Sequence, residues 1–254
     1  MRIIMLAGRG NSTRYIYNGL KEEFEISKVL LTDSKSRMKM LKRRVINLGY
    51  FNVLNQLLFQ TIIVRILKIL SNSIINIRLK ELNLDLTDIP DEVLINVGLV
   101  NSETTINTIQ NLNPDIIIVN GTSIISTKVL EATNAIFINT HVGITPEYRG
   151  VHGGYWALRN NDKKNFGVTV HIVDKGIDTG SILYQDITEV KKGDNFLTYP
   201  LYQYALAIPL LKKTLLDIKM NQMQPYKKEN SRSRLYYHPT FTKYILGWLL
   251  KGVK

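Results

Sequence analysis

Three side chains in the middle of the chain have types and a spacing suited to acid–base chemistry: Asn139, His141 and Asp178. Residues two apart in a strand point to the same face, so Asn139 and His141 are expected to project into one site. The asparagine amide is a neutral hydrogen-bond donor, and a histidine nitrogen can donate or accept a proton near neutral pH. Asp178 can orient the histidine or stabilise its charge. Together they predict a site that stabilises developing charge and moves a proton.

Two predicted strands position these residues. A short apolar run at 135–139 leads into the Asn-x-His pair, and residues 167–173 alternate as a second strand before the glycine-containing loop 174–180. Glycines permit the tight backbone that would bring Asp178 back toward the strand end. His171 alternates with apolar neighbours and is interpreted as a packed strand histidine, whereas His152 is either a decoy or a substrate contact.

Strand-like and helix-like runs alternate along most of the chain, which predicts an α/β fold with a doubly wound, mainly parallel, twisted sheet. Further strands are expected at 2–7, 26–31, 93–97 and 114–119, and helices at 34–44, 102–112, 126–133 and 197–220. Ligands of such sheets bind at the carboxyl ends of the strands. The loop that follows the strand at 114–119 is therefore a candidate binding loop.

A Gly8-x-Gly10 turn separates the first predicted strand from the first helix. Backbone N–H groups at such a helix start can hold phosphate. The third glycine of the dinucleotide fingerprint is absent, so a phosphate or substrate loop is favoured over NAD binding, and a plain strand-to-helix turn is an equal alternative. The apolar start is too short for a signal peptide, which predicts a cytoplasmic protein.

The composition narrows the classes of function. The 254 residues contain no cysteine and 4 histidines without zinc-site spacing, so no metal site is predicted. The formal net charge of +12 points to an anionic partner, and nucleic acid, a phosphorylated metabolite, an acidic cofactor and an anionic membrane surface all remain open.

Four segments outside the predicted site have alternative interpretations. The basic run 34–44 is expected to be a solvated helix face, with phosphate or nucleic-acid contact as the alternative. The apolar stretch 49–77 is expected to be a long amphipathic helix packed on the core, with a position on a membrane surface as the alternative. A hairpin is expected in the basic, aromatic stretch 224–240. The helix at 241–254 is expected to pack within the protein, with a membrane or a second copy as alternatives.

Four motifs in matching order give the chain a resemblance to a known family: Asn139-Thr140-His141, 146–150 (PEYRG), 167–169 (GVT) and 178–180 (DTG). The chain resembles the folate-dependent formyltransferases, which include glycinamide ribonucleotide, methionyl-tRNA and sugar N-formyltransferases. The resemblance covers most of residues 1–190 and fades in 35–110 and after 195. It implies a Rossmann-like catalytic domain at 1–195, followed by a helix and hairpin extension at 196–254.

The resemblance also implies roles for residues. Asn139, His141 and Asp178 would be catalytic in formyl transfer from 10-formyltetrahydrofolate to an amine. The folate would lie against two loops and the acceptor against two others. The implied folate residues are Gly121, Thr122, Ile124, Ile125, Val173, Asp174 and Ile177, and the implied acceptor residues are Gly10, Asn11, Ser12, Tyr148, Arg149 and Gly150.

The acceptor implied by the resemblance is a nucleotide-linked amino sugar, a precursor of a cell-surface polysaccharide. About 60 residues follow Asn195, fewer than the basic barrel of methionyl-tRNA formyltransferases would need, so nucleic acid is disfavoured. Glycinamide ribonucleotide, methionyl-tRNA and a catalytically inactive binding protein are the alternatives. A membrane surface and a second copy of the chain are further candidate partners.

Overall fold

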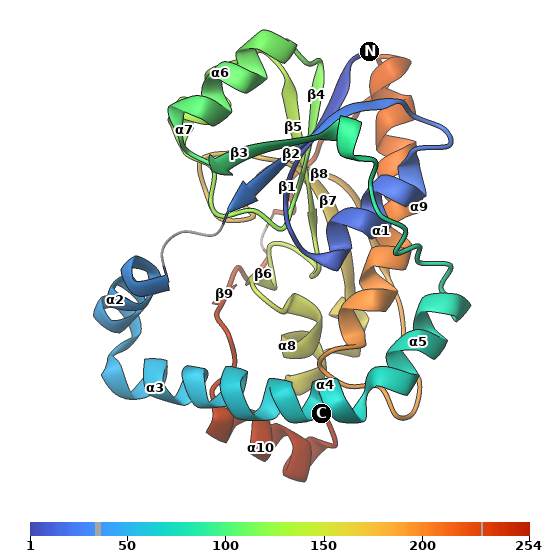
Figure 1. Ribbon diagram of the computed structural model, residues 1–254. Coiled ribbons are helices and arrows are strands. Elements are labelled where there is room, and N and C mark those ends of the chain that lie inside the picture. The colour runs from blue at the N-terminus through green and yellow to red at the C-terminus, as the bar shows by residue number, and fades with distance from the viewer. Residues whose placement is uncertain (34–36, 230) are drawn as a thin grey trace.

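The computed structural model describes residues 1–33, 37–229 and 231–254 (Figure 1). Within these residues seven strands form one sheet in the order β3-β2-β1-β4-β5-β7-β8. The strands from β1 to β5 pair in parallel, and β7 and β8 are antiparallel additions at one edge. The predicted doubly wound, mainly parallel sheet is confirmed. Its strands are β1 (Ile3–Gly8), β2 (Ile26–Asp33), β3 (Leu94–Leu99), β4 (Ile116–Asn120), β5 (Ile136–His141), β7 (Gly167–Ile172) and β8 (Ile182–Ile187).

Helices cover both faces of this sheet, and β1 shows how the sequence produces the two layers. Successive side chains of a strand point to opposite faces. Met5 and Ala7 pack in the same cluster as side chains of α1 (Asn11–Leu20) and α9 (Tyr199–Lys219). Ile4 and Leu6 pack with α6 (Glu103–Leu112) and α7 (Thr127–Leu130) on the other face. The central β4, which is buried throughout, accordingly reads as a continuous apolar run.

Helix α9 begins close to Pro200 and contains Pro209. Its residues Ala207, Leu211 and Leu215 belong to the main core. The helix packs against β7, β8 and α1, so it covers one face of the main sheet although it follows the predicted domain boundary at 195. That division stays a prediction.

Between β2 and β3 the chain forms a series of helices that crosses one end of the molecule (Figure 1). Phe59 and Ile63 on their inner side pack with Tyr155, Phe196 and Tyr244. Core packing, as expected for 49–77, therefore holds for one side, and much of the other side is exposed. Residues 34–36 of the basic run lie outside the described residues. The helices are α2 (Arg37–Leu48), α3 (Tyr50–Leu58), the π-helical turn η1 (Phe59–Ile63), α4 (Val64–Leu70) and α5 (Asn72–Glu81).

The hairpin predicted in 224–240 is wrong. Tyr226 bridges to Ile182, and β9 (Leu235–Tyr236) pairs in parallel with β6 (Arg149–Gly150). Gly150 has a φ of +95°, and a Cβ at this position would lie 2.2 Å from the Tyr236 carbonyl oxygen. A glycine here therefore permits the close approach of the second strand. The remaining elements are η2 (Asp91–Val93), α8 (Gly153–Arg159), η3 (Lys163–Asn165) and α10 (Phe241–Lys251).

Candidate active site

The predicted catalytic residues lie where β5 meets β7. The antiparallel register places Asn139 opposite His171, and His141 opposite Thr169. Strands β1 and β4 end at the same edge as β5, because all three run in parallel. Neighbouring strands are about 4.8 Å apart, so the carboxyl ends of β1 and β5 are separated by roughly 10 Å. The sheet thus presents the ends of three strands to one ligand.

Asn139 is held by a histidine whose contribution the sequence analysis missed. The Asn139 amide nitrogen lies 3.1 Å from Nε2 of His171, and Nδ1 of His171 lies 2.9 Å from the Ile172 carbonyl oxygen. A carbonyl can only accept, so Nδ1 carries the proton and Nε2 accepts from the amide. Burial lowers the pKa of His171 and favours this neutral form. The predicted packed strand histidine is buried, but it also orients Asn139.

His141 is fixed by contacts at both ring nitrogens. Nε2 donates to the Tyr148 carbonyl oxygen at 2.7 Å, and Nδ1 lies 3.4 Å from Oδ2 of Asp178. Because Nε2 carries a proton, Nδ1 is the ring nitrogen that faces the carboxylate and can accept a proton. A Cβ on Gly143 would lie 2.7 Å from Nε2, so this glycine leaves room for the ring.

Asp178 connects the two loops that the sequence assigned to different ligands. Its Oδ2 accepts a hydrogen bond from the Gly150 amide at 2.8 Å, and Arg149 donates to the Ile177 carbonyl oxygen at 2.9 Å. The φ of Asp178 is 51°, a left-handed conformation that aspartate tolerates better than most residues. Asp178 is 15% exposed and His141 only 5%, so water and substrate reach the carboxylate more readily than the ring.

The residues implied for folate binding lie on two loops. Ile124 is 57% exposed, whereas Ile125 is buried in the cluster that also receives Val173. Asp174 accepts hydrogen bonds from the Gly176 amide at 3.0 Å and the Thr179 hydroxyl at 2.7 Å, so its carboxylate shapes the loop around Ile177. The left-handed Gly121 begins the first loop, in which the Thr122 hydroxyl donates to the Ser123 carbonyl.

The loop after β1 contacts the end of β4. Asn120 donates to the Ser12 hydroxyl at 3.0 Å, and a Cβ on Gly8 would lie 2.4 Å from the Gly121 carbonyl oxygen. Gly10 precedes α1, and Asn11 is its first residue. The Thr13 amide bonds to the Gly10 carbonyl oxygen at 3.0 Å, and the N–H groups of Asn11 and Ser12 begin the helix at the carboxyl edge of the sheet.

His152 lies outside this group of residues. Its Nε2 is 3.0 Å from Nδ1 of His238, and the ring packs against Phe196. Burial lowers the pKa of His152 to about 3 and that of His238 to about 4, so both rings are neutral at pH 7. The ring serves packing between α8 and the segment before α10, which favours the interpretation of His152 as a decoy over that of a substrate contact.

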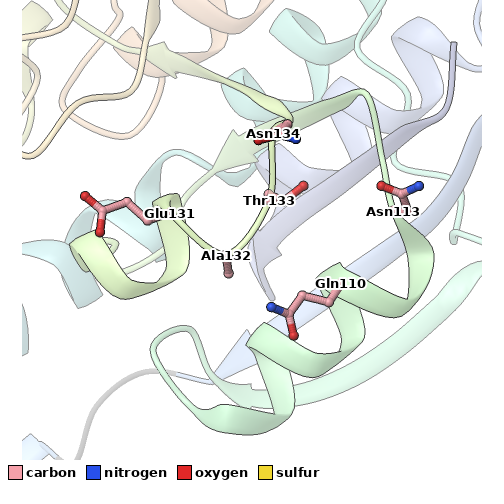
Figure 2. A pocket seen from close by; sticks show the side chains of 6 residues that line it. All are labelled: Gln110, Asn113, Glu131, Ala132, Thr133 and Asn134. Carbon is pink, nitrogen blue, oxygen red and sulfur yellow. The ribbon is translucent and has the colours of Figure 1, made fainter.

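A surface hollow of about 250 Å³ lies elsewhere, between the end of α6 and the connection from α7 to β5 (Figure 2). Its lining contains no residue of the predicted site: Gln110, Asn113, Glu131, Ala132, Thr133 and Asn134. Residues 1–33, 37–229 and 231–254 contain no group of three His, Cys, Asp or Glu side chains placed to hold a metal ion.

The arrangement can serve transfer of a carbonyl group to a nucleophile. The second amide N–H of Asn139 is a donor for an oxygen that becomes negative, and its orientation is set by His171 rather than by solvent. Asp178 can accept a proton, and the paired His141 can share it or stabilise the charge.

The model of the formyl transferase family matches residues 1–200 of the chain. A methionyl-tRNA formyltransferase of Caldanaerobacter subterraneus is 28% identical over 153 residues, which are 60% of this chain and 48% of that protein. The chain thus spans about half the length of this curated relative.

Solved structures share the fold at low sequence identity. A sugar N-formyltransferase from Shewanella sp. FDAARGOS_354 gives a TM-score of 0.58 at 16% identity, over 93% of this chain and 76% of that one. An N-formyltransferase from Helicobacter canadensis, in complex with folinic acid and dTDP-3-aminofucose, gives a TM-score of 0.56 at 19% identity. The match covers 93% of this chain and 71% of that one. The motifs around Asn139, His141 and Asp178 fall inside the family match, which extends over most of the 254 residues. The chain belongs to the formyl transferase family.

Proposed function

We propose that the protein transfers the formyl group of 10-formyltetrahydrofolate to the amino group of a nucleotide-linked amino sugar. The observation that carries the transfer chemistry is the connected set Asn139, His171, His141 and Asp178 at the carboxyl end of β5. Attack of an amine on a formyl group creates an oxyanion and an ammonium, so it needs both a donor and a proton acceptor.

The chain's own groups divide this work. Asn139 donates to the formyl oxygen as it becomes negative, and His171 prevents its amide from turning away. Asp178 takes the proton of the attacking amine, directly or through water, and His141 stabilises the carboxylate and holds a proton at Nδ1. The family's folate cosubstrate supplies the formyl group when bound. No covalent bond to the protein is needed.

The loops around the site fit a folate. Ile124 offers an exposed apolar surface to a flat ring, and Oδ1 of the adjacent buried Asn120 has no hydrogen-bond partner among the described residues. We assign the donor to the side of Gly121, Thr122, Ile124 and Ile125, opposite Val173, Asp174 and Ile177. This assignment rests on the positions of these residues, which lie in the loops that follow β4 and β7, and on the packing of Val173 against the cluster that contains Ile125.

The opposite side of Asp178 suits an anionic acceptor. Arg149 donates to the carbonyl oxygen of Ile177, the residue before Asp178, and its Nε is buried without a hydrogen-bond partner among the described atoms. Arg234 lies over the ring of Tyr236 on the paired strand. We assign the acceptor to Tyr148, Arg149 and Gly150, and its phosphates to Gly10, Asn11 and Ser12. One structural neighbour named as a sugar N-formyltransferase and another in complex with dTDP-3-aminofucose support the choice of sugar.

Methionyl-tRNA is the second candidate acceptor, because the sequence relatives carry that name and the chain is basic. The test is formyl transfer from 10-formyltetrahydrofolate to a panel of acceptors: dTDP-, UDP- and GDP-linked 3-amino and 4-amino sugars, glycinamide ribonucleotide and methionyl-tRNA. Turnover of one nucleotide sugar, lost in Asp178→Asn, is expected. Turnover of methionyl-tRNA instead would replace the sugar, and folate binding without any turnover would remove the enzymatic proposal.

A further inference from the structure

An unusually apolar surface lies on the helices between β2 and β3. We call residues 50–81 the helical arm, which comprises α3, η1, α4 and α5 and crosses one end of the molecule (Figure 1). Among the described residues, one helical run, Tyr50–Leu70, is long and apolar enough to cross a membrane by length and composition, and only 22% of its most apolar window is buried. Exposed side chains recur along this run every three or four residues, a spacing that places them on one helix face. This outer stripe consists of Phe51, Leu54, Leu58, Ile62, Ile66 and Ile69.

The opposite side of the arm is held by hydrogen bonds and aromatic packing to residues from the C-terminal part of the chain. Gln56 donates to the His238 carbonyl oxygen at 2.9 Å, and Oδ1 of Asn55 accepts from the Thr242 amide at 3.2 Å. The Phe59 ring packs 5.0 Å from that of Phe196. At the far end, the Asn195 amide donates to the Ser71 hydroxyl at 2.8 Å. These contacts fix the arm along the protein surface, so the outer stripe faces away from the core.

Helix α10 extends the apolar surface. It packs against α3 and η1, and its exposed apolar residues are Leu246, Trp248, Leu249 and Leu250. The Lys254 ammonium lies 5.7 Å from the centre of the Trp248 ring. Exposed apolar side chains gathered on two helices that pack together mark an interaction site rather than scattered exposure. A tryptophan beside a lysine is the pairing favoured where water meets lipid.

The charge of the protein identifies the partner. Residues 34–80 contain ten Lys and Arg and no Asp or Glu, and residues 230–254 contain five Lys and Arg and no Asp or Glu. The rest of the chain holds 18 basic and 21 acidic residues, so the net positive charge comes from these two segments. Six of the ten basic residues of the first segment lie at 35–44, just before the helical arm, and the arm itself holds four basic residues and Glu81. Arg65 and Lys68 on the arm and Lys243 and Lys251 on α10 are exposed.

We propose that the helical arm and α10 form a docking surface for an anionic lipid membrane, with the arm lying in the plane of the membrane. The outer stripe and Trp248 enter the boundary between headgroups and acyl chains, and the surrounding lysines and arginines neutralise acidic headgroups. A second copy of the chain fits this surface poorly, because a symmetric contact would bring two strongly basic surfaces together. Spanning the membrane would break the contacts of Asn55, Gln56 and Phe59 with the protein.

Vesicle co-sedimentation of the full chain tests this surface. We expect binding to vesicles of phosphatidylcholine with phosphatidylglycerol, little binding to phosphatidylcholine alone, and release by salt because the charges are screened. Neutralising one exposed basic residue, as in Lys68→Gln, should weaken binding about fivefold. Absence of binding to the anionic vesicles would overturn the proposal.

A matched pair of double substitutions separates the docking surface from general effects of charge. Ile62→Glu/Ile66→Glu places two acids in the outer stripe, and Leu216→Glu/Met220→Glu places two acids on exposed apolar residues at the end of α9. The first variant should bind anionic vesicles at least about tenfold more weakly, and the second within about twofold of wild type. Equal losses would overturn the proposal. If the first variant unfolds, Ile69→Glu, whose side chain is 80% exposed, replaces it.

Tryptophan fluorescence reports where the surface makes contact. Trp248 is 44% exposed, whereas Trp156 is buried at 9%. On anionic vesicles we expect a blue shift of the emission and quenching by brominated acyl chains, both removed by Trp248→Phe. Binding without a change at Trp248 would overturn the placement of α10. A dimer in light scattering that the stripe variant converts to a monomer, with no vesicle binding, would assign the surface to a second copy instead.

Discussion

Asp178 is the residue on which the proposed proton transfer depends most directly. Its carboxylate accepts from the Gly150 amide and faces Nδ1 of His141. In Asp178→Asn the side-chain carbonyl can still accept from Gly150, so the loop should persist while the proton acceptor is lost. We expect turnover to fall about 10²- to 10⁴-fold, with folate affinity nearly unchanged.

The control for this substitution lies in the same loop. Asp174→Asn removes the same charge from a residue that bonds to Gly176 and Thr179 rather than to His141. Because Asp174 belongs to the loop assigned to the donor, the variant should bind folate more weakly but retain most of the turnover at saturating donor. Initial rates at saturating donor and a fluorescence titration with a folate analogue measure both variants, and comparable losses of turnover in the two would contradict the assigned role of Asp178.

His171 should act on the rate through Asn139. In His171→Ala the Asn139 amide loses its acceptor and becomes free to rotate, so kcat should fall about 10- to 100-fold with little change in KM for the acceptor. Because burial lowers the pKa of His171, the ring is already neutral at the working pH, and the shape of the pH–rate profile should remain that of the wild type. A shifted profile would show that His171 itself exchanges the proton.

The positions of Asn139, His141 and Asp178 in this site were predictable from the sequence, and the role of His171 was not. Asn139 and His141 are two apart in one strand, so their shared face follows from the pleat. Asp178 needed only a tight loop to return to that strand. His171 was interpreted as packed because its neighbours Val170 and Ile172 are apolar, and its partner Asn139 is evident only from the register between β5 and β7.

At the level of elements, a buried ion pair attaches α5 to the segment that leads into α9. Arg78 donates to Asp194 at 3.0 Å and to Glu81 at 2.8 Å, and Tyr202 donates to Asp194 at 2.6 Å. The Asp194 side chain is fully buried. Arg78→Ala should lower the free energy of unfolding by about 3–5 kcal/mol, because it leaves that carboxylate buried and uncompensated.

A neighbouring residue provides the control for this ion pair. Lys191 bonds to the exposed side of Glu81, and its own side chain is 59% exposed. Lys191→Ala should cost less than about 1 kcal/mol. Denaturant unfolding of both variants measures the difference, and similar losses would contradict the importance of burial.

Some elements were predictable because their environment is simple. The run at 114–119 is apolar on both sides, as a strand covered by helices on both faces must be. The stretch 49–77 has large apolar residues on both its buried and its exposed sides, such as Phe59 and Ile62, so its sequence does not distinguish the face that meets Phe196 from the face that meets solvent. The segment 224–240 resembled a hairpin, but its extended residues pair with Gly150 and Ile182, which are distant in sequence and were not identifiable as partners.

At the level of the whole molecule, acid should destabilise the fold through a histidine pair. His152 and His238 bond to each other between α8 and the segment before α10, and burial lowers their pKa values to about 3 and about 4. The unfolded chain binds protons near pH 6.5 and the folded chain does not, so stability is highest above that pH and declines as the pH falls toward 4. At pH 5 the loss should be roughly 2 kcal/mol per histidine.

Unfolding by denaturant at pH 7 and pH 5 measures this loss. His152→Asn suits the control, because asparagine tolerates the left-handed φ of 59° at this position and does not titrate. The variant is expected to start from a lower stability at pH 7 and to lose less of it on acidification. An unchanged dependence on pH would contradict the role of the pair.

The π-helical turn η1 lies between α3 and α4 and sets how the side chains of α4 are rotated about the helix axis relative to those of α3. A residue advances an α-helix by about 100°, so deleting one residue within Phe59–Ile63 would rotate the following half by about that angle. Ile66 and Ile69 would then leave the line of Leu54 and Leu58, although the composition of the arm would hardly change. Relatives of this protein are therefore expected to tolerate exchanges of one apolar residue for another along the stripe, but not a change of length within this turn.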